Sequence, residues 1–257
     1  MALASDDQPE QPPIGIIPAA GLATRLAPLV YPKELLPIVY LDEDGRLVPK
    51  MVIELSLDQL RTAGVERCSV IVSSDKLELV RILGDGARYG LSLNYLVQAK
   101  PAGLSHALAI AGSWSRDRDI CLALPDTVIY PRDAFAQIRQ ERARTGADVV
   151  LAVFPTNRPE TLGPVVAAAD GRVLEVQDKP RSPQLRNTWG GAIWSKAFTE
   201  LLLAEVAKDE AVVLGKIFQR AVERGFDVRA VEFSTGRFLD VGTAEGLHEL
   251  LSRRSMV

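Results

Sequence analysis

Four short apolar runs in the first 155 residues constrain the fold more than any other feature of this chain. They are IGIIPA (14–19), CSVIVSS (68–74), ICLALPD (120–126) and ADVVLAVFP (147–155), and their apolar stretches are continuous rather than alternating. Continuous apolar strands are typical of a parallel sheet that is covered on both faces. Segments with helical spacing separate the runs, so the repeated order of strand, helix and strand predicts a doubly wound α/β sheet with right-handed crossovers.

Further helices and strands are expected along the rest of the chain. The expected helices cover 51–64, 76–84, 103–114, 132–146, 196–207, 211–225 and the stretch TAEGLHELLSRR near the C-terminus. The other expected strands are 91–98, 187–195, FDVRAVEF and GRFLDVG, and Asp170-Gly171 predicts a hairpin within 165–180. We therefore expect one domain over 14–257, with a doubly wound half (14–155) and a smaller mixed lobe (156–257).

The composition is that of a globular chain without a bias toward polyanionic surfaces. The 257 residues are 47% hydrophobic and 25% charged, with a net charge of −3. One large core is therefore within reach, and binding to nucleic acid or to an anionic membrane is not expected. No apolar stretch is long enough to cross a bilayer. The N-terminal MALASDDQPEQPP lacks the features of a signal peptide, so we expect a disordered leader over 1–13 and a cytoplasmic protein.

The cysteines and histidines predict neither a disulfide framework nor a zinc site. Cys68 and Cys121 each lie inside an apolar run, as buried small side chains do. His106 and His248 have no second metal ligand at helical spacing. A serine hydrolase is not expected either, because the chain has no Gly-x-Ser-x-Gly turn.

The segment that follows the first expected strand, IIPAAGLATRLAPLVYPKELLP, combines small residues with cations. Small residues before a helix start let the backbone approach a phosphate and donate N–H groups to it. Arg25 adds a forked cation, and Lys33 follows a proline in an apolar stretch. The segment lacks the glycines of a dinucleotide fingerprint and the Gly-Lys-Ser/Thr of a Walker A loop. Taken alone, it fits a phosphate site and an ordinary strand–helix turn equally well.

Polar residues also stand where other expected strands end, which is where open α/β sheets bind their ligands. Asp126 and Asp240 end two apolar runs, and carboxylates there can hold Mg²⁺ near phosphates, although each alone also suits a turn or a helix cap. Lys179 closes the expected hairpin and could face a second phosphate. The amide of Gln98 suits the edge of a base. Together these residues suggest metal-assisted phosphoryl transfer.

The same stretches resemble the signature of the sugar-nucleotide pyrophosphorylases, and most closely the bacterial UTP–glucose-1-phosphate uridylyltransferases and glucose-1-phosphate thymidylyltransferases. The likeness covers nearly the whole chain and rests on five ordered matches: IIPAAGLATRLAPLVYPKELLPI, VQAKPAGLSHALAIA, LPD at 124–126, VLEVQDKP and FLDVGTAEGL. The resemblance implies a Rossmann-like nucleotidyltransferase fold with a small mixed sugar-binding lobe. It also implies transfer from UTP or dTTP to a sugar 1-phosphate such as glucose 1-phosphate, dependence on Mg²⁺, and, by analogy, a homodimer or homotetramer.

The resemblance further implies a role for each matching residue. Nucleotide binding would fall to Ala19, Ala20, Gly21, Arg25, Gln98, Gly103 and Asp126. Binding of the sugar phosphate would fall to Gly163, Asp178, Lys179 and Gly190, and Asp126 and Asp240 would hold Mg²⁺. Arg25, Lys33 and Lys179 would serve the reaction itself.

Three departures from the family pattern keep other functions open. Ala23 stands where the family usually has glycine, Asp178 replaces a glutamate, and Pro164 follows Gly163 in the expected sugar pocket. Alanine at a position that needs positive φ would cost about 1 kcal/mol. One alternative is nucleotidyl transfer to another phosphate, as in the phosphocholine-type cytidylyltransferases. Another is a catalytically silent relative that binds sugar nucleotides as a regulator.

Overall fold

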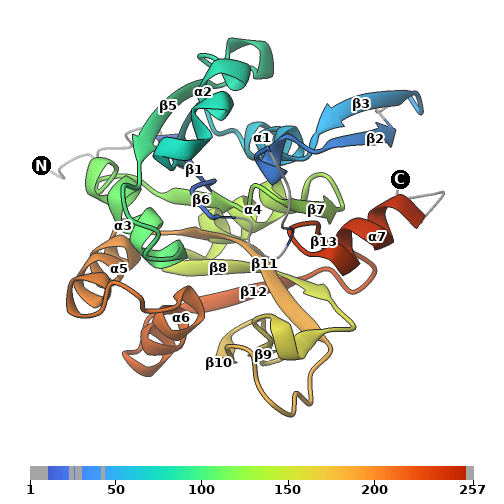
Figure 1. The fold of residues 1–257 in the computed structure, drawn as a ribbon. Coiled ribbons are helices and arrows are strands. Elements are labelled where there is room, and N and C mark those ends of the chain that lie inside the picture. Colours follow the sequence, from blue (N-terminus) through green and yellow to red (C-terminus); the bar gives the residue numbers. More distant parts are fainter. Residues whose placement is uncertain (1–10, 23–25, 27–30, 42–43, 253–257) are drawn as a thin grey trace, which may run out of the picture.

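A seven-stranded sheet forms the centre of the protein in a computed structural model that describes residues 11–22, 26, 31–41 and 44–252, with Tyr40 and Leu41 described by their backbone alone (Figure 1). The sheet order is β12-β8-β11-β6-β1-β4-β5. Its strands are β1 (Ile14–Pro18), β4 (Arg67–Val72), β5 (Ser92–Val97), β6 (Ile120–Ala123), β8 (Val149–Pro155), β11 (Asn187–Trp194) and β12 (Val228–Glu232). All neighbouring pairs are parallel except those of β11, which runs antiparallel to both β6 and β8. The expected doubly wound, mostly parallel sheet is confirmed.

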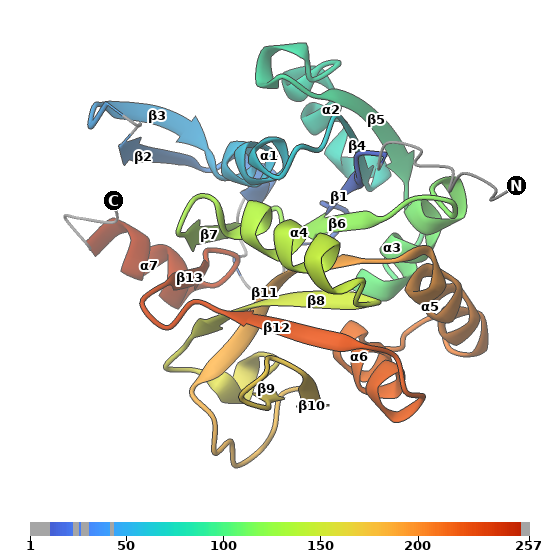
Figure 2. The same ribbon diagram turned by 180° about the vertical axis from the view of Figure 1, so that it is seen from behind.

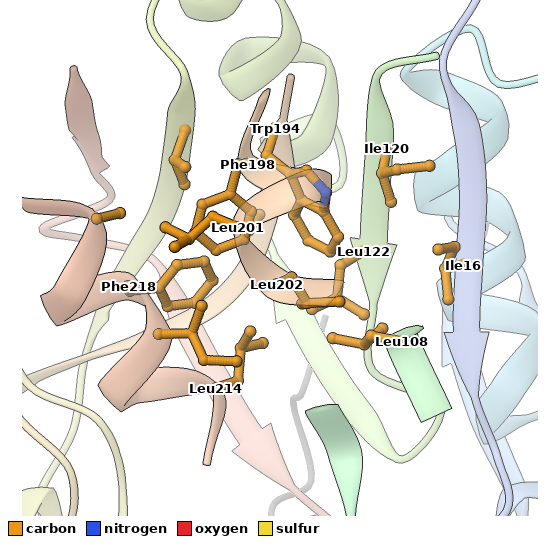
Figure 3. Close-up of a cluster of buried hydrophobic side chains, with 14 of the residues drawn as sticks. Ile16, Leu108, Ile120, Leu122, Trp194, Phe198, Leu201, Leu202, Leu214 and Phe218 are labelled. Atoms are coloured by element: carbon orange, nitrogen blue, oxygen red, sulfur yellow. The ribbon is translucent and has the colours of Figure 1, made fainter. Parts of the chain in front are cut away.

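Helices cover both faces of this sheet (Figures 1 and 2). On one face the core includes residues of α1 (Val52–Thr62), α2 (Leu77–Leu83) and α4 (Ala134–Thr145). On the other face lie α3 (Leu104–Trp114), α5 (Lys196–Lys208) and α6 (Leu214–Glu223). Figure 3 shows part of this second core, where Phe198 and Phe218 stack with their ring centroids 5.3 Å apart. The inner strands β1, β4, β6 and β8 are buried on both faces, which explains why their sequences do not alternate.

The two halves of the chain share the sheet. Strand β11 comes from the second half and lies between β6 and β8 of the first, and β12 adds the edge beyond β8. The two halves expected on either side of residue 155 therefore contribute strands to the same sheet. The smaller hairpin of β9 (Val165–Ala167) and β10 (Val173–Val176) forms as expected, with Gly171 at φ +83° in its turn.

Two small strand pairs were not expected from the sequence. β2 (Pro37–Leu41) pairs with β3 (Leu47–Met51), and β7 (Thr127–Tyr130) pairs with β13 (Arg237–Asp240). The first pair carries a proline in each strand, which a two-stranded ribbon tolerates because every strand is an edge. In the second pair, β7 follows β6 in the chain, and β13 precedes α7 (Ala244–Ser252), the last described helix. It thereby brings Asp240 beside the segment that follows β6.

Other expectations meet the structure only in part. Cys68 and Cys121 are buried free thiols, as expected. The leader expected over 1–13 falls mostly outside the described residues. Among the helices that the structure describes, none is long and apolar enough to cross a membrane. The cytoplasmic location and the homodimer or homotetramer stay predictions.

Candidate active site

The carboxyl ends of four neighbouring strands bring several of the expected site residues to one edge of the sheet. β6, β1, β4 and β5 are parallel neighbours in that order, so their carboxyl ends point the same way. The segments that follow them carry Asp126, Gly21, Lys76 and Gln98, respectively. Segments at such an edge are the usual ligand-binding positions of α/β sheets.

Lys33 and Asp126 form an ion pair at this edge. Lys33 opens the short 3-10 helix η2 (Lys33–Leu35), and its Nζ donates to Oδ2 of Asp126. The two side chains are only 10% and 13% exposed. The turn that carries Asp126 is held by Ser56 of α1, whose hydroxyl donates to the carbonyl of Leu124 at 2.7 Å. The lysine expected near the reacting phosphates therefore lies against one of the expected metal ligands.

Asp240 reaches the same place from the far end of the chain. It pairs with Thr127 in the β13–β7 register, and the next residue, Val241, donates its N–H to the carbonyl of Asp126 at 3.0 Å. Oδ1 of Asp240 accepts from the backbone N–H of Gly242 at 2.8 Å. These backbone bonds fix the carboxylate of Asp240 beside the Asp126 turn.

Gly242 marks the point at which the three charged groups meet. A Cβ placed on Gly242 would lie 2.8 Å from Nζ of Lys33 and 2.9 Å from Oδ1 of Asp240, and closer still to Oδ2 of Asp126. A side chain there would push these charged groups apart, so glycine permits their close approach. Two hard carboxylate oxygens around one point, beside a ligand edge, are a donor set that suits Mg²⁺, which takes its other ligands from phosphates and water. The described residues include no group of three or more His, Cys, Asp or Glu that could hold a metal by themselves.

Gln98 is a buried amide at the end of β5, and it is 5% exposed. Its Nε2 donates to the carbonyl of Gly103 at 3.1 Å and lies 2.9 Å from Nδ1 of His106. If both amide N–H groups are used in these two bonds, the ring of His106 carries its proton on Nε2. The remaining polar atom of the Gln98 amide is then Oε1, an acceptor. Gly103 adopts φ +93° next to open space, so glycine suits this turn.

Lys179 lines a cleft of about 700 Å³ together with Asp240. The rest of its lining comes from the end of β8 and the segment after it, from β13 and the residues flanking it, and from α7: Pro155, Thr156, Asn157, Arg158, Glu160, Thr161, Leu162, Gly236, Arg237, Phe238, Leu239, Thr243, Glu245 and Glu249. Lys179 has φ +45°, the only positive φ among the described residues other than glycine. Its N–H donates to the carbonyl of Leu162 at 2.9 Å. The backbone is thus held in an unfavourable conformation that projects a lysine beside the cleft.

The other residues expected to bind the sugar phosphate lie around this cleft rather than on its wall. Gly163 packs on the indole ring of Trp189, and Gly190 packs under Phe238, whose ring does line the cleft. Asp178 lies beside Gly215 in the first turn of α6, where the helix dipole favours a carboxylate. Their roles toward a ligand stay predictions.

Part of the expected phosphate loop lies outside the described residues, including Arg25, Ala23 and the expected helix start. Of the small residues before it, Ala19 and Ala20 are buried, and Gly21 is exposed with no atom within 4 Å of an added Cβ. The loop therefore begins with a fixed buried strand end and an open glycine.

Three residues of this edge received no role from the sequence: Glu34, Lys76 and Gly242. Glu34 and Gly242 lie in the motifs Pro-Lys-Glu and Asp-Val-Gly, next to Lys33 and Asp240, which were expected in the site. Their place in these motifs was the sequence signal that could have identified them. Lys76 carried no signal, because a lysine in a polar stretch reads as a surface residue. The structure instead buries Lys76 against Glu34, whose side chain is 1% exposed.

This mostly parallel sheet, with paired aspartates and a lysine at its carboxyl edge, is the architecture of an α/β nucleotidyltransferase. The nucleotidyl transferase family model matches residues 14–254. The chain therefore belongs to the nucleotidyl transferase family.

Among curated relatives, the chain is similar to glucose-1-phosphate thymidylyltransferases. It is 29% identical over 250 residues to the one from Neisseria meningitidis serogroup A, which covers 93% of this chain and 81% of the relative. It is 27% identical over 242 residues to the one from Streptomyces griseus, which covers 91% of this chain and 64% of the relative.

Solved structures share the fold. A candidate glucose-1-phosphate thymidylyltransferase from Bacillus anthracis in complex with sucrose superposes with a TM-score of 0.80 at 22% identity, over 95% of this chain and 97% of that one. A UDP-glucose pyrophosphorylase complexed with UDP-glucose gives 0.76 at 19% identity, over 93% and 97%. The expected family and fold are confirmed.

Proposed function

We propose that this protein transfers a nucleotidyl group from UTP or dTTP to a sugar 1-phosphate, with glucose 1-phosphate as the first candidate. The products would be a nucleoside diphosphate sugar and pyrophosphate. The observation that carries the proposal is the convergence of Lys33, Asp126 and Asp240 on Gly242, beside the cleft that Lys179 lines. The names of the curated relatives and of the solved structures support this choice of substrates.

Asp126 and Asp240 would hold Mg²⁺ at this point. The bound ion would neutralise charge on the triphosphate and orient its α-phosphate. Lys33 would exchange part of its contact with Asp126 for phosphate oxygens once the triphosphate is present.

The chain's own cations and backbone would align the two substrates. Lys179 would hold the phosphate of the sugar so that one of its oxygens faces the α-phosphorus in line with the leaving pyrophosphate. The new bond forms between that oxygen and the α-phosphorus, and the bond between the α-phosphorus and the bridging oxygen to the β-phosphate breaks. The attacking oxygen is already an anion, so no strong general base is required. Alignment and charge neutralisation would supply the rate enhancement.

Gln98 would read the base through its carbonyl oxygen. With both amide N–H groups engaged by Gly103 and His106, Gln98 has no donor to spare for the two-point contact that an adenine edge takes from glutamine. It can accept one N–H, and the N3 imides of uracil and thymine offer one. This arrangement is compatible with uracil and thymine and makes UTP and dTTP equivalent at Gln98.

The test is pyrophosphate release with each of UTP, dTTP, CTP, ATP and GTP, paired with glucose 1-phosphate and Mg²⁺. We expect release with UTP or dTTP and loss of release when EDTA removes the metal. Use of CTP alone, with phosphocholine as acceptor, would replace this proposal with the cytidylyltransferase alternative. Tight nucleotide binding without turnover on a panel of sugar 1-phosphates would replace it with the silent relative.

A further inference from the structure

A buried lysine behind the candidate site uses all three of its N–H donors within the protein. Nζ of Lys76 donates to Oε1 and Oε2 of Glu34 at 2.7 and 2.9 Å and to the carbonyl of Ala19 at 2.9 Å. The side chains of Lys76 and Glu34 are 8% and 1% exposed. Burial raises the pKa of Glu34, and the neighbouring Lys76 opposes this rise. Both groups are buried and bound to each other, so neither is assigned a catalytic role.

The partners of Lys76 belong to the two backbone segments on which the proposed reaction depends. Ala19 is the first residue after β1, and its N–H is already bound to the carbonyl of Ile71 at 2.8 Å. The bond from Lys76 fixes its other polar group, two residues before the open Gly21. Glu34 lies in η2 directly after Lys33, whose ammonium pairs with Asp126. The ammonium group of Lys76 therefore connects the start of the turn after β1, here called the nucleotide turn (19–22), to η2, the short helix that carries Lys33.

We propose that Lys76 is a positioning residue for the nucleoside triphosphate, because it sets the nucleotide turn after β1 and the Lys33 helix in register with each other. The proposal rests on the function proposed above. A surface lysine would not be buried, and the third N–H of the Lys76 ammonium is satisfied by the backbone after β1 rather than by a residue of its own element. Lys76 itself enters the fold through η3 (Ser74–Lys76), at the end of the neighbouring strand β4.

A second buried carboxylate offers a matched control. Glu205 on α5 is 3% exposed in its side chain and pairs with Lys208 on α5, with Arg220 on α6 and with Arg224 directly after α6. Its carboxylate is nearly as inaccessible as that of Glu34, although its partners are more exposed than Lys76, and the partners that the structure gives it include no candidate site residue. Glu205→Gln should therefore lower stability without changing substrate binding.

The test compares the full-length wild type, the double variant Lys76→Met with Glu34→Leu, and Glu205→Gln. Removing Lys76 alone would strand a buried carboxylate and could prevent folding, whereas an apolar pair of similar size often keeps a protein folded. Circular dichroism and the melting temperature check folding. The readouts are hydrogen–deuterium exchange of peptides within 14–22 without ligand, the Kd of UTP and dTTP with Mg²⁺ by calorimetry, and KM for each substrate.

For the double variant we expect faster exchange within 14–22 and a Kd for the triphosphate that is weaker by about tenfold or more, as for lost charge-assisted bonds. The KM for the sugar phosphate should change by less than about threefold, and Glu205→Gln should change none of these values. A folded double variant with unchanged exchange, or with a Kd within about twofold of the wild type, would overturn the inference. A wild type that binds no triphosphate would instead overturn the proposed function on which it rests.

Discussion

The two ends of the candidate site are built differently. At the phosphate end, Lys33, Asp126 and Asp240 come from segments far apart in the sequence and meet at a single glycine, with backbone hydrogen bonds on either side. At the proposed sugar end, a cleft of about 700 Å³ is lined by Lys179 and by side chains from the segment after β8, from β13 and from α7, with Arg158 and Arg237 among them. The first end is tight and largely buried, and the second is open.

This difference suits a site in which one end performs the reaction on the triphosphate and the other end selects the sugar. A triphosphate and its metal ion present the same charges for every sugar, so rigid placement of a few groups benefits all reactions of this kind. A cleft lined by flexible side chains can change its shape with few substitutions. Variation in the chain therefore has most room at the proposed sugar end. The proposed substrate roles divide in the same way, and each prediction below tests one side of the division.

Asp240→Asn should give the largest loss of activity. Asparagine keeps an oxygen that can accept from Gly242, so the turn and the fold should persist, but the charge that would hold Mg²⁺ is gone. We expect turnover to fall by about 100-fold or more, measured as pyrophosphate release at saturating substrates. Asp126→Asn should behave alike.

Asp170→Asn is the matched control for this change. Asp170 accepts from the backbone N–H two residues later, at 3.1 Å from Arg172, as Asp240 does from Gly242. It lies in the β9–β10 turn and has no expected metal role. Normal turnover in Asp240→Asn would remove that carboxylate from the metal site, and an equal loss in Asp170→Asn would make the effect one of turn geometry.

Two substitutions at Lys179 separate its charge from its backbone. Lys179→Met removes the ammonium and keeps the length, and Lys179→Gly also relieves the φ of +45°. We expect both to raise KM for the sugar phosphate by about 10- to 100-fold, with a smaller effect on the KM for the triphosphate. Lys179→Gly should in addition stabilise the fold by up to about 1 kcal/mol, measured by denaturant unfolding. A KM that changes for the triphosphate alone would place Lys179 at the other end of the site.

The sequence predicts the parts of this molecule that local pattern controls. Continuous apolar runs predict the buried strands, and the helices between them follow from apolar spacing and stops such as Gly146, which caps α4 at φ +69°. Asp126, Asp240 and Lys33 are identifiable because each stands next to a strand end or in a quoted motif. The sequence does not predict that these three residues meet, because their meeting depends on the pairing of β13 with β7, which are more than 100 positions apart.

Two features of the site have no local signal at all. The place of β11 between β6 and β8 depends on pairing between strands far apart in the sequence, so a pattern read along the chain places β11 in a separate lobe. The burial of Lys76 is also a tertiary effect, since only the approach of Glu34 and Ala19 makes a buried ammonium stable. Local sequence gives residue types and strand ends, and the three-dimensional pairing decides their partners.

Gln98→Ala should alter selection rather than chemistry, at the nucleotide end. The substitution removes the acceptor offered to the base and the two bonds to Gly103 and His106. We expect the ratio of kcat/KM between the preferred triphosphate and CTP to fall by about tenfold, with a smaller loss of kcat. Gln59→Ala is the control, because Gln59 is also a buried amide and its Nε2 donates to the carbonyl of Ile129 at 3.3 Å. If donor preference is unchanged in Gln98→Ala, or falls equally in Gln59→Ala, Gln98 does not read the base.

Glu205→Gln should change stability and leave both ends of the site unaltered, which makes it the smallest effect on activity. The hydrogen bond from Lys208, together with Arg220 and Arg224, lowers the pKa of Glu205 although burial opposes this. A carboxylate whose pKa is lower in the folded state contributes stability above its unfolded pKa of about 4.3, and loses that contribution as the pH falls through the folded value.

The melting temperature of Glu205→Gln should therefore lie below that of the wild type at pH 7, and the gap should close as the pH is lowered past about 4. Turnover and both KM values should stay within about twofold of the wild type at pH 7, since the partners of Glu205 lie on α5, on α6 and directly after α6. A gap that persists unchanged in acid would mean that the network acts through packing of the arginine and lysine stems rather than through the charge of Glu205. A change in either KM would mean that α5 and α6 are coupled to the site, and the contrast between a rigid phosphate end and an adjustable sugar end would have to include them.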